Sequence, residues 1–191
     1  MKRGLIGGLG SWISGQELAA SLGISRAAVW KAVASLRAEG YEIEASKRGY
    51  RLSALPDLLT EDLIQGGLKT KLVGRRIIAA EALPSTNAEA KRFAASEEGT
   101  VVIAEVQTAG RGRMDRSWHS PRGGVWMSII LKPQIPPAQT FRVNIAAAVA
   151  VARALEGLYG LEVKIKWPND LMVGGRKVSG IRRRSGRIWT G

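Results

Sequence analysis

The sequence contains no cysteine and only one histidine, His119, among its 191 residues. Without cysteine the chain can form no disulfide, no thiolate metal site and no cysteine nucleophile. A single histidine argues against a histidine-based metal cluster and against a Ser-His-Asp triad. We therefore expect no protein-held metal site, and a chemistry that depends on other side chains.

Long apolar segments are also missing. The longest apolar stretch, Ile145–Ala152, is far shorter than the ~20 residues that cross a membrane. The weakly apolar N-terminal run contains Gly7, Gly8 and Gly10 and is cut off at Gln16, unlike the continuous apolar part of a signal peptide. We expect a cytoplasmic protein without membrane association.

Acidic residues are few: 16 Asp and Glu stand against 29 Lys and Arg, a formal net charge of +13. Such an excess indicates a polyanionic partner. Its distribution is uneven, because residues 173–191 hold six basic residues and no acidic one, whereas residues 1–55 hold eight and four. Hydrophobic residues make up 45% of the chain, which is enough for a folded core and excludes general disorder.

Residues 1–55 have the pattern of a winged helix-turn-helix domain. A short helix is predicted over residues 16–22 and ends at Gly23, which accepts a left-handed conformation. Ile24 is expected to be buried, and Ser25 to cap a second helix over residues 26–39. Apolar residues of that helix recur at spacings of four and three and form one core-facing stripe. The stripe consists of Val29, Val33 and Leu36.

A basic hairpin follows the two helices. Strands are predicted over residues 41–45 and 50–52, joined by a tip at Ser46–Gly49. In a winged helix the second helix enters the major groove and the wing contacts phosphate. The predicted DNA-binding residues are Ser25, Arg26, Ala27, Trp30, Lys31, Lys47 and Arg48. The alternatives are a helix-turn-helix used only for protein contacts and, for Trp30, a packing role.

The rest of the chain, residues 56–191, is predicted to be a second domain of the α+β class, beginning near Pro56. Helices and strands are mixed and some strands are consecutive, which is typical of a mixed sheet. The predicted helices cover residues 58–66, 88–95 and 144–159. The predicted strands cover residues 76–81, 101–106, 125–131, 161–166 and 178–181.

Two motifs in this domain carry polar groups at the ends of predicted strands. Ser85, Thr86 and Asn87 lie between a strand and a helix; Thr86 with Glu89 fits a capping box, and the alternative is hydrogen bonding to a polar ligand. Residues 107–113 read QTAGRGR, in which glycine lets the backbone approach a ligand and arginine binds phosphate or carboxylate. The glycine spacing fits neither a Walker loop nor a dinucleotide fingerprint. A flexible basic loop or an RNA-contacting turn is the alternative.

Further motifs follow this loop. Trp118 lies only five residues after the QTAGRGR stretch, so it could stack on the base of a ligand bound there. The alternative is that Trp118 is a core residue. Lys166–Asp170 reads KWPND, a strand that ends in a rigid turn with a carboxylate and an amide. Lys177 begins a strand and could neutralise a reacting phosphate, although a lone lysine there is usually a solvated charge.

Taken together, the Ser-Thr-Asn triplet, GRGRxxRxW at residues 110–118, KWPND and Lys177-x-x-Gly180-Ile181 resemble the biotin protein ligase family in order and spacing. With the winged helix in front, the chain resembles the bifunctional biotin ligases and biotin operon repressors. The resemblance covers about residues 12–181. It implies a class II synthetase-like catalytic domain with a mixed sheet.

The resemblance also implies a reaction and its participants. Biotin and ATP, with Mg²⁺, would give biotinyl-5′-AMP, and the biotinyl group would pass to a lysine of a biotin carboxyl carrier protein; operator DNA would be the second partner. The implied catalytic residues are Lys177, Arg111 and Arg113. The implied biotin-binding residues are Ser85, Thr86, Asn87, Gln107, Arg111, Gly112, Arg113 and Lys177. The implied adenylate-binding residues are Arg113, Arg116, Trp118 and Asn169. The alternatives are a lipoate-type ligase, against which GRGRxxRxW argues, and a DNA-binding protein with an inactive ligase remnant.

The segment after Ile181 departs from the family pattern. Residues 182–191 read RRRSGRIWTG, without acidic residues and without strand alternation. We hypothesise that family sequence stops near residue 182, as after a reading-frame shift, and that this is a truncated ligase with weak or no ligase activity. The alternative is a basic tail that binds nucleic acid. Repressor dimers of the family pair through the central sheet, including a strand missing here, which argues against a dimer.

Overall fold

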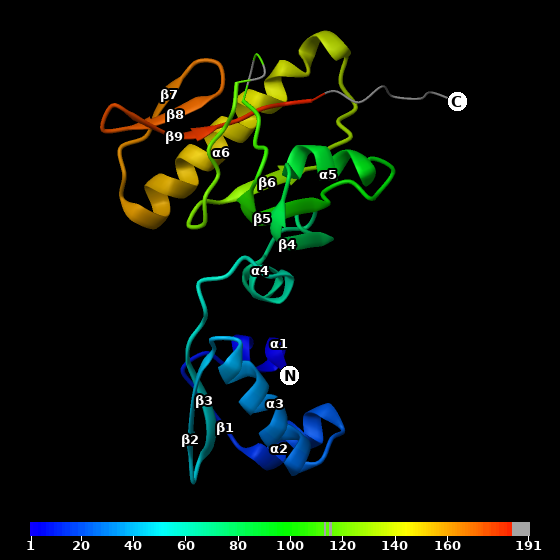
Figure 1. The fold of residues 1–191 in the computed structure, drawn as a ribbon, viewed down its shortest axis with the longest axis vertical. Coiled ribbons are helices and arrows are strands. Elements are labelled where there is room, and N and C mark those ends of the chain that lie inside the picture. The colour runs from blue at the N-terminus through cyan, green and yellow to red at the C-terminus, as the bar shows by residue number, and fades with distance from the viewer. Residues whose placement is uncertain (113, 115, 185–191) are drawn as a thin grey trace.

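The computed structural model describes residues 1–112, 114 and 116–184, without the side chain of Arg3. The N-terminal part consists of two helices and a small sheet, preceded by a further short helix (Figure 1). Its elements are α1 (Lys2–Gly7), β1 (Trp12–Ile13), α2 (Gly15–Leu22), α3 (Arg26–Ala38), β2 (Glu42–Ser46) and β3 (Gly49–Ala54). The strands pair antiparallel in the order β1-β3-β2, so β2 and β3 form the predicted hairpin.

The turn between α2 and α3 follows the predicted capping. Gly23 has a φ of 63° and ends α2, and the Ser25 hydroxyl accepts a hydrogen bond from the Ala28 amide at 3.1 Å. The expectation that Ile24 is buried is wrong, because its side chain is 38% exposed. Its backbone amide donates to Ala19 O, which closes the helix end without bringing the side chain into the core.

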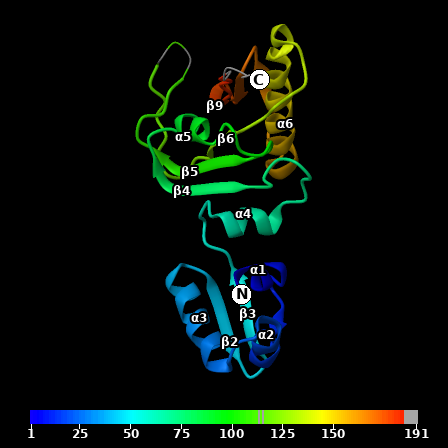
Figure 2. The same ribbon diagram turned by 90° about the vertical axis from the view of Figure 1, so that its right-hand side faces the viewer.

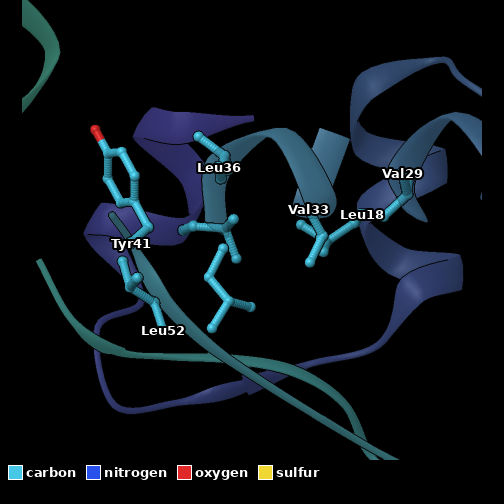
Figure 3. Close-up of a cluster of buried hydrophobic side chains, with 8 residues drawn as sticks. Leu18, Val29, Val33, Leu36, Tyr41 and Leu52 are labelled. Carbon is cyan, nitrogen blue, oxygen red and sulfur yellow. The ribbon is translucent and has the colours of Figure 1, made fainter. Parts of the chain in front are cut away.

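The core of the N-terminal part is one cluster of apolar side chains (Figure 3). The predicted stripe of α3 is confirmed, since Val29, Val33 and Leu36 are all buried in it. Leu5 joins the cluster from α1, a helix that its glycines concealed from sequence analysis. Packing of the Leu5 side chain therefore holds a helix that intrinsic propensity does not favour.

The second part contains two three-stranded sheets and a long helix. Its elements are α4 (Glu61–Gly67), β4 (Ile77–Leu83), α5 (Thr86–Arg92), β5 (Val101–Gln107), β6 (Trp126–Ile129), the 3₁₀ helix η2 (Pro137–Gln139), α6 (Phe141–Tyr159), β7 (Lys164–Lys166), β8 (Asp170–Val173) and β9 (Arg176–Gly180). In the first sheet β4 and β5 are parallel, whereas β6 pairs antiparallel with β5. The predicted α+β fold with a mixed sheet is confirmed.

The second sheet is an antiparallel meander of β7, β8 and β9 that packs against α6. Ala148 and Ala152 of α6 and Leu171 of β8 form a small buried cluster between them. Strand β8 was not predicted, because Asn-Asp after a proline indicated a longer turn. The turn takes only residues 167–169, since Lys166 already pairs with Asp170. Among the described helices, none has the length and apolar character needed to cross a membrane.

Helix α4 is shared between the two parts of the chain. Leu63 packs against the N-terminal core, whereas Leu59, just before the helix, and Ile64 pack against the cluster beneath β4 and β5. Figure 2 shows α4 lying between the winged helix and the first sheet. The Leu59 amide also donates to the buried Glu105 carboxylate of β5 at 2.6 Å. The connection between the two parts is therefore packed as well as covalent.

Candidate functional site

Polar residues meet at the carboxyl ends of β4 and β5. Because these strands are parallel and adjacent, the Ser-Thr-Asn triplet after β4 lies beside Gln107 at the end of β5. Ser85, not Thr86, is the N-cap of α5, since its hydroxyl accepts from the Ala88 amide at 3.4 Å. The predicted capping role of Thr86 is therefore wrong. The Thr86 side chain is buried and turns to Gln107 instead.

A chain of hydrogen bonds runs through these residues. Gln107 Oε1 accepts from the Thr86 amide at 2.9 Å and from the Thr86 hydroxyl at 3.1 Å. Gln107 Nε2 donates to Ser120 Oγ at 2.9 Å, and Ser128 Oγ donates to Thr86 Oγ1 at 2.9 Å. Sequence reasoning missed Ser120 and Ser128. The one available sign for Ser128 was a serine inside an otherwise apolar predicted strand.

Residues 107–120 are here called the Arg-Gly loop, and its described residues form the two sides of an irregular hairpin. Bridges join Gln107 to Ser120 and Arg111 to Ser117, and the Trp118 amide donates to Gly110 O at 2.9 Å. The hairpin returns Trp118 to the base of the loop, while the predicted Arg111 and Arg116 lie exposed on it and Gly112 is half-buried. The predicted Arg113 lies outside the described residues.

Gly110 permits the closure of this hairpin. A Cβ atom at residue 110 would lie 2.5 Å from Trp118 O, 2.7 Å from Ser120 Oγ and 3.2 Å from Gln107 Nε2. Two of these contacts are too short for any real side chain, and the nearest one is to backbone. The glycine is therefore required by close approach rather than by an unusual φ.

Lys177 reaches the same region from β9. Its ammonium nitrogen lies 2.8 Å from Asp170 Oδ1 and 4.7 Å from the centroid of the Trp118 ring. An ion pair and a cation–π contact together fix the position of the ammonium group. Asn169 is 8% exposed, and its amide donates to Asp170 Oδ1 at 2.8 Å. Asn169 thereby helps to orient Asp170, and the contact with the adenylate that the family resemblance implies for Asn169 stays a prediction.

The structure thus connects four motifs that are far apart in sequence. Thr86 bonds Gln107 at the start of the Arg-Gly loop, and Gln107 bonds Ser120 at its end, whose hydroxyl donates to Trp118 O at 3.1 Å. The ring of Trp118 then contacts Lys177. A set of hydrogen-bonded polar groups, an aromatic ring and a positioned ammonium therefore lie along one continuous path.

The predicted DNA-binding residues occupy one type of environment. All seven are exposed, including Trp30 at 63%, which argues against the packing role for that residue. Lys47 and Arg48 form the tip of the β2–β3 hairpin. Cations and one aromatic ring therefore remain accessible at the start of α3 and on the wing.

Two models of known protein families match this chain, one in each of its two parts. The model of the Biotin/lipoate A/B protein ligase family matches residues 79–190, more than half of the chain. The chain belongs to this family. The matched range includes residues 182–190, for which the sequence pattern alone predicted a break. A model described as an HTH domain matches residues 9–51.

Relatives of the ligase family can be compared over most of this chain. The Bifunctional ligase/repressor BirA of Bacillus subtilis (strain 168) is 49% identical over 174 residues, which cover 89% of this chain and 54% of that protein. The chain therefore spans about half the length of this relative. Two solved structures of Aquifex aeolicus biotin protein ligase, a point variant with biotin and the enzyme with biotin and ATP, have TM-scores of 0.53 and 0.50. Both are 30% identical and cover 59% of this chain and 48% of theirs.

Proposed function

We propose that this protein is a biotin protein ligase that also binds DNA as a repressor. In the first step an oxygen of the biotin carboxylate attacks the α-phosphorus of ATP, forming biotinyl-5′-AMP as pyrophosphate leaves. In the second step the amine of a lysine on a biotin carboxyl carrier protein attacks the activated carbonyl, forming an amide and releasing AMP. The attacking amine has two hydrogens; one stays on the amide nitrogen, and the other is released to solvent as a proton.

The observation that carries this proposal is the position of Lys177 at the end of the polar path. Two anions, a carboxylate and a phosphate, must approach each other in the first step, and a fixed cation offsets their repulsion. The Lys177 ammonium is held by Asp170 and Trp118 at the point where the Arg-Gly loop closes. Arg111, Arg113 and Arg116 of that loop would supply further positive charge.

The remaining predicted residues would bind the two substrates. Thr86, Gln107 and Ser85 offer hydroxyl and amide groups for the polar head of biotin, with Asn87 beside them. Trp118 would lie against the adenine. Mg²⁺ would arrive on the ATP phosphates, because in nucleotide sites this ion is held mainly by substrate phosphates and water, with only one or two carboxylates.

The test is single-turnover synthesis of biotinyl-5′-AMP, with protein in excess over labelled biotin so that slow synthesis is detected. We expect slow adenylate formation by the unaltered chain, in keeping with the weak activity hypothesised from its sequence, and at least about a hundredfold less from Lys177→Ala, the range seen when one group that stabilises developing charge is removed. Lys164→Ala is the matched control, since its exposed side chain pairs only with Glu162 in the described structure. Adenylate formed equally well by the Lys177 variant would contradict the proposed role.

A second measurement separates the two halves of the proposal. Calorimetric binding of biotin and ATP reports on the ligase half, and binding to duplex DNA reports on the winged helix. The exposed cations at the start of α3 and on the wing favour a DNA partner. DNA binding without any biotin or ATP binding would favour the alternative, a DNA-binding protein with an inactive ligase remnant.

A further inference from the structure

Two serines outside the recognised motifs close both ends of the hydrogen-bonded chain through Thr86 and Gln107. Ser128 lies on β6 and Ser120 at the base of the Arg-Gly loop, and they are 9% and 3% exposed. Thr86 between them is 2% exposed. Buried hydroxyl groups at this depth need partners, and both serines find them within this chain of bonds.

The direction of every proton in the chain follows from one backbone carbonyl. Trp118 O can only accept, so the Ser120 hydroxyl donates to it and the Ser120 oxygen accepts from Gln107 Nε2. The Gln107 amide nitrogen therefore faces Ser120, and its oxygen faces Thr86. The Thr86 amide, which can only donate, bonds the same oxygen and supports this orientation of the side-chain amide.

The proton of the Thr86 hydroxyl is directed in turn. Because Gln107 Oε1 can only accept, the Thr86 hydroxyl donates to it. Ser128 must then donate to Thr86 Oγ1. Beyond these bonds, Thr86 Oγ1 has one lone pair left and Gln107 Nε2 one hydrogen. An acceptor beside a donor complements a ligand that carries N–H and C=O side by side, as a cyclic urea does.

We propose that Ser128 and Ser120 are positioning residues that fix this proton order and thereby select a cyclic urea head group. Ser128 donates to Thr86 Oγ1, so that the remaining lone pair of Thr86 Oγ1 points to the ligand N–H. Ser120 accepts from Gln107 Nε2, so that the remaining hydrogen of Gln107 Nε2 points to the ligand C=O. This inference rests on the proposed function, because biotin supplies the cyclic urea.

The test is calorimetric binding of three probes: biotin, biotin methylated on a ureido nitrogen, and 2-iminobiotin, in which C=NH replaces C=O. Ser128→Ala should weaken biotin about tenfold, the cost of one lost buried hydrogen bond, and leave the methylated probe within about twofold. Ser120→Ala should narrow the preference for biotin over 2-iminobiotin, because the Gln107 Nε2 group loses the bond that directs its second hydrogen toward the ligand. Ser128→Thr, which keeps the hydroxyl, should restore the preference for biotin over the methylated probe.

Thr100→Val is the matched control. Thr100 is fully buried just before β5 and donates to Glu97 O at 2.7 Å, so its loss should lower the melting temperature without changing any probe preference. Equal weakening of biotin and the methylated probe by Ser128→Ala, or no change in either, would overturn the inference alone. If the unaltered chain binds none of the three probes, the proposed function fails and the inference fails with it.

Discussion

The winged-helix part gathers its buried apolar side chains into one cluster of eight, whereas the larger ligase part has two separate clusters of three, with Val102 and Ala104 buried outside them. The ligase part also leaves large apolar side chains exposed, among them Met127 on β6, Trp167 in the turn after β7 and Val178 on β9. Apolar burial is the main favourable contribution to folding. The smaller part therefore derives its order from packing to a greater degree than the larger part.

The candidate site of the ligase part is held by polar contacts rather than by apolar packing. Its residues are placed by directional contacts, namely the chain through Thr86 and Gln107 and the ion pair of Lys177 with Asp170. Such contacts fix geometry more than they stabilise, because each net hydrogen bond contributes only about 1 kcal/mol. A core holds the winged helix, and a polar framework holds the site.

The largest effect is expected from Gly110→Ala. The added Cβ meets backbone and Ser120 within 2.7 Å, so the Arg-Gly loop must move away from Gln107. We expect loss of biotin binding by about a hundredfold or more, equivalent to at least ~3 kcal/mol, with DNA affinity unchanged, as measured by calorimetry and by a DNA-binding assay. Gly157→Ala is the control, since nothing lies within 4 Å of the added atom and alanine favours its helix. Intact biotin binding in the Gly110 variant would show that the loop is not held against Gln107.

Next in size is a matched pair of core truncations, Val33→Ala in the N-terminal cluster and Val102→Ala in β5. Both side chains are fully buried, and each loss should cost about 2 kcal/mol. Hydrogen exchange followed by peptide should show lost protection only in the part that carries the change. If Val33→Ala also exposes β5, the two parts unfold as one unit and the comparison above does not hold.

A smaller effect is expected from Lys31→Ala on the exposed face of α3. Removing one phosphate contact should reduce DNA affinity severalfold and lower the slope of log affinity against log salt by about 1. The measurement is a salt titration of binding to duplex DNA. Lys164→Ala on β7 is the control, with no expected change in slope. An unchanged slope for the Lys31 variant would mean that α3 does not face the duplex as proposed.

The smallest effect concerns the ion pair that fastens α1 to α3. The hydrogen bond to Glu39, at 2.5 Å, raises the pKa of Lys2 above its ordinary value of 10.5. Because the ammonium is held more tightly in the folded chain, its contribution is complete below pH 10.5 and is lost as the pH rises through the higher folded-state value. Both side chains are partly exposed, so Lys2→Met should cost only about 0.5 kcal/mol. Denaturant unfolding should show a larger difference between variant and parent at pH 8 than at pH 11, because the contribution declines above pH 10.5.

Sequence patterns predicted the elements that repeat a simple signal. The stripe of Val29, Val33 and Leu36 follows helical spacing, and Ser25 and Gly23 are residues that helix ends prefer, so these predictions agree with the structure. Helix α1 and strand β8 were missed because tertiary contacts override local preference there. Leu5 packs into the N-terminal core, although the glycines around it gave no helical signal. Asp170 pairs with Lys166 across a turn of three residues, whereas the Asn-Asp sequence had indicated that Asp170 belongs to the turn.

The candidate site was predictable in its residue types but not in its connections. The motifs brought Thr86, Gln107, Trp118 and Lys177 to attention separately, and only the fold places them on one path. Thr86 was expected to cap a helix because its spacing to Glu89 fits, but Ser85 takes that role. A serine in an apolar strand marked Ser128 as unusual, but local pattern could not give its partner, because Thr86 lies 42 residues away.

The position of α4 also has a consequence for how the domains of this protein could be exchanged. A chimera that joins a foreign DNA-binding module at residue 56 would retain Leu63 with no core to cover it and would remove the surface that α1 offers to α4. If instead residues 1–67 were transferred as a unit, Ile64 would be removed from the apolar cluster beneath β4 and β5. Modular transfer of the winged helix therefore requires redesign of both faces of one seven-residue helix, whichever side of it the junction takes.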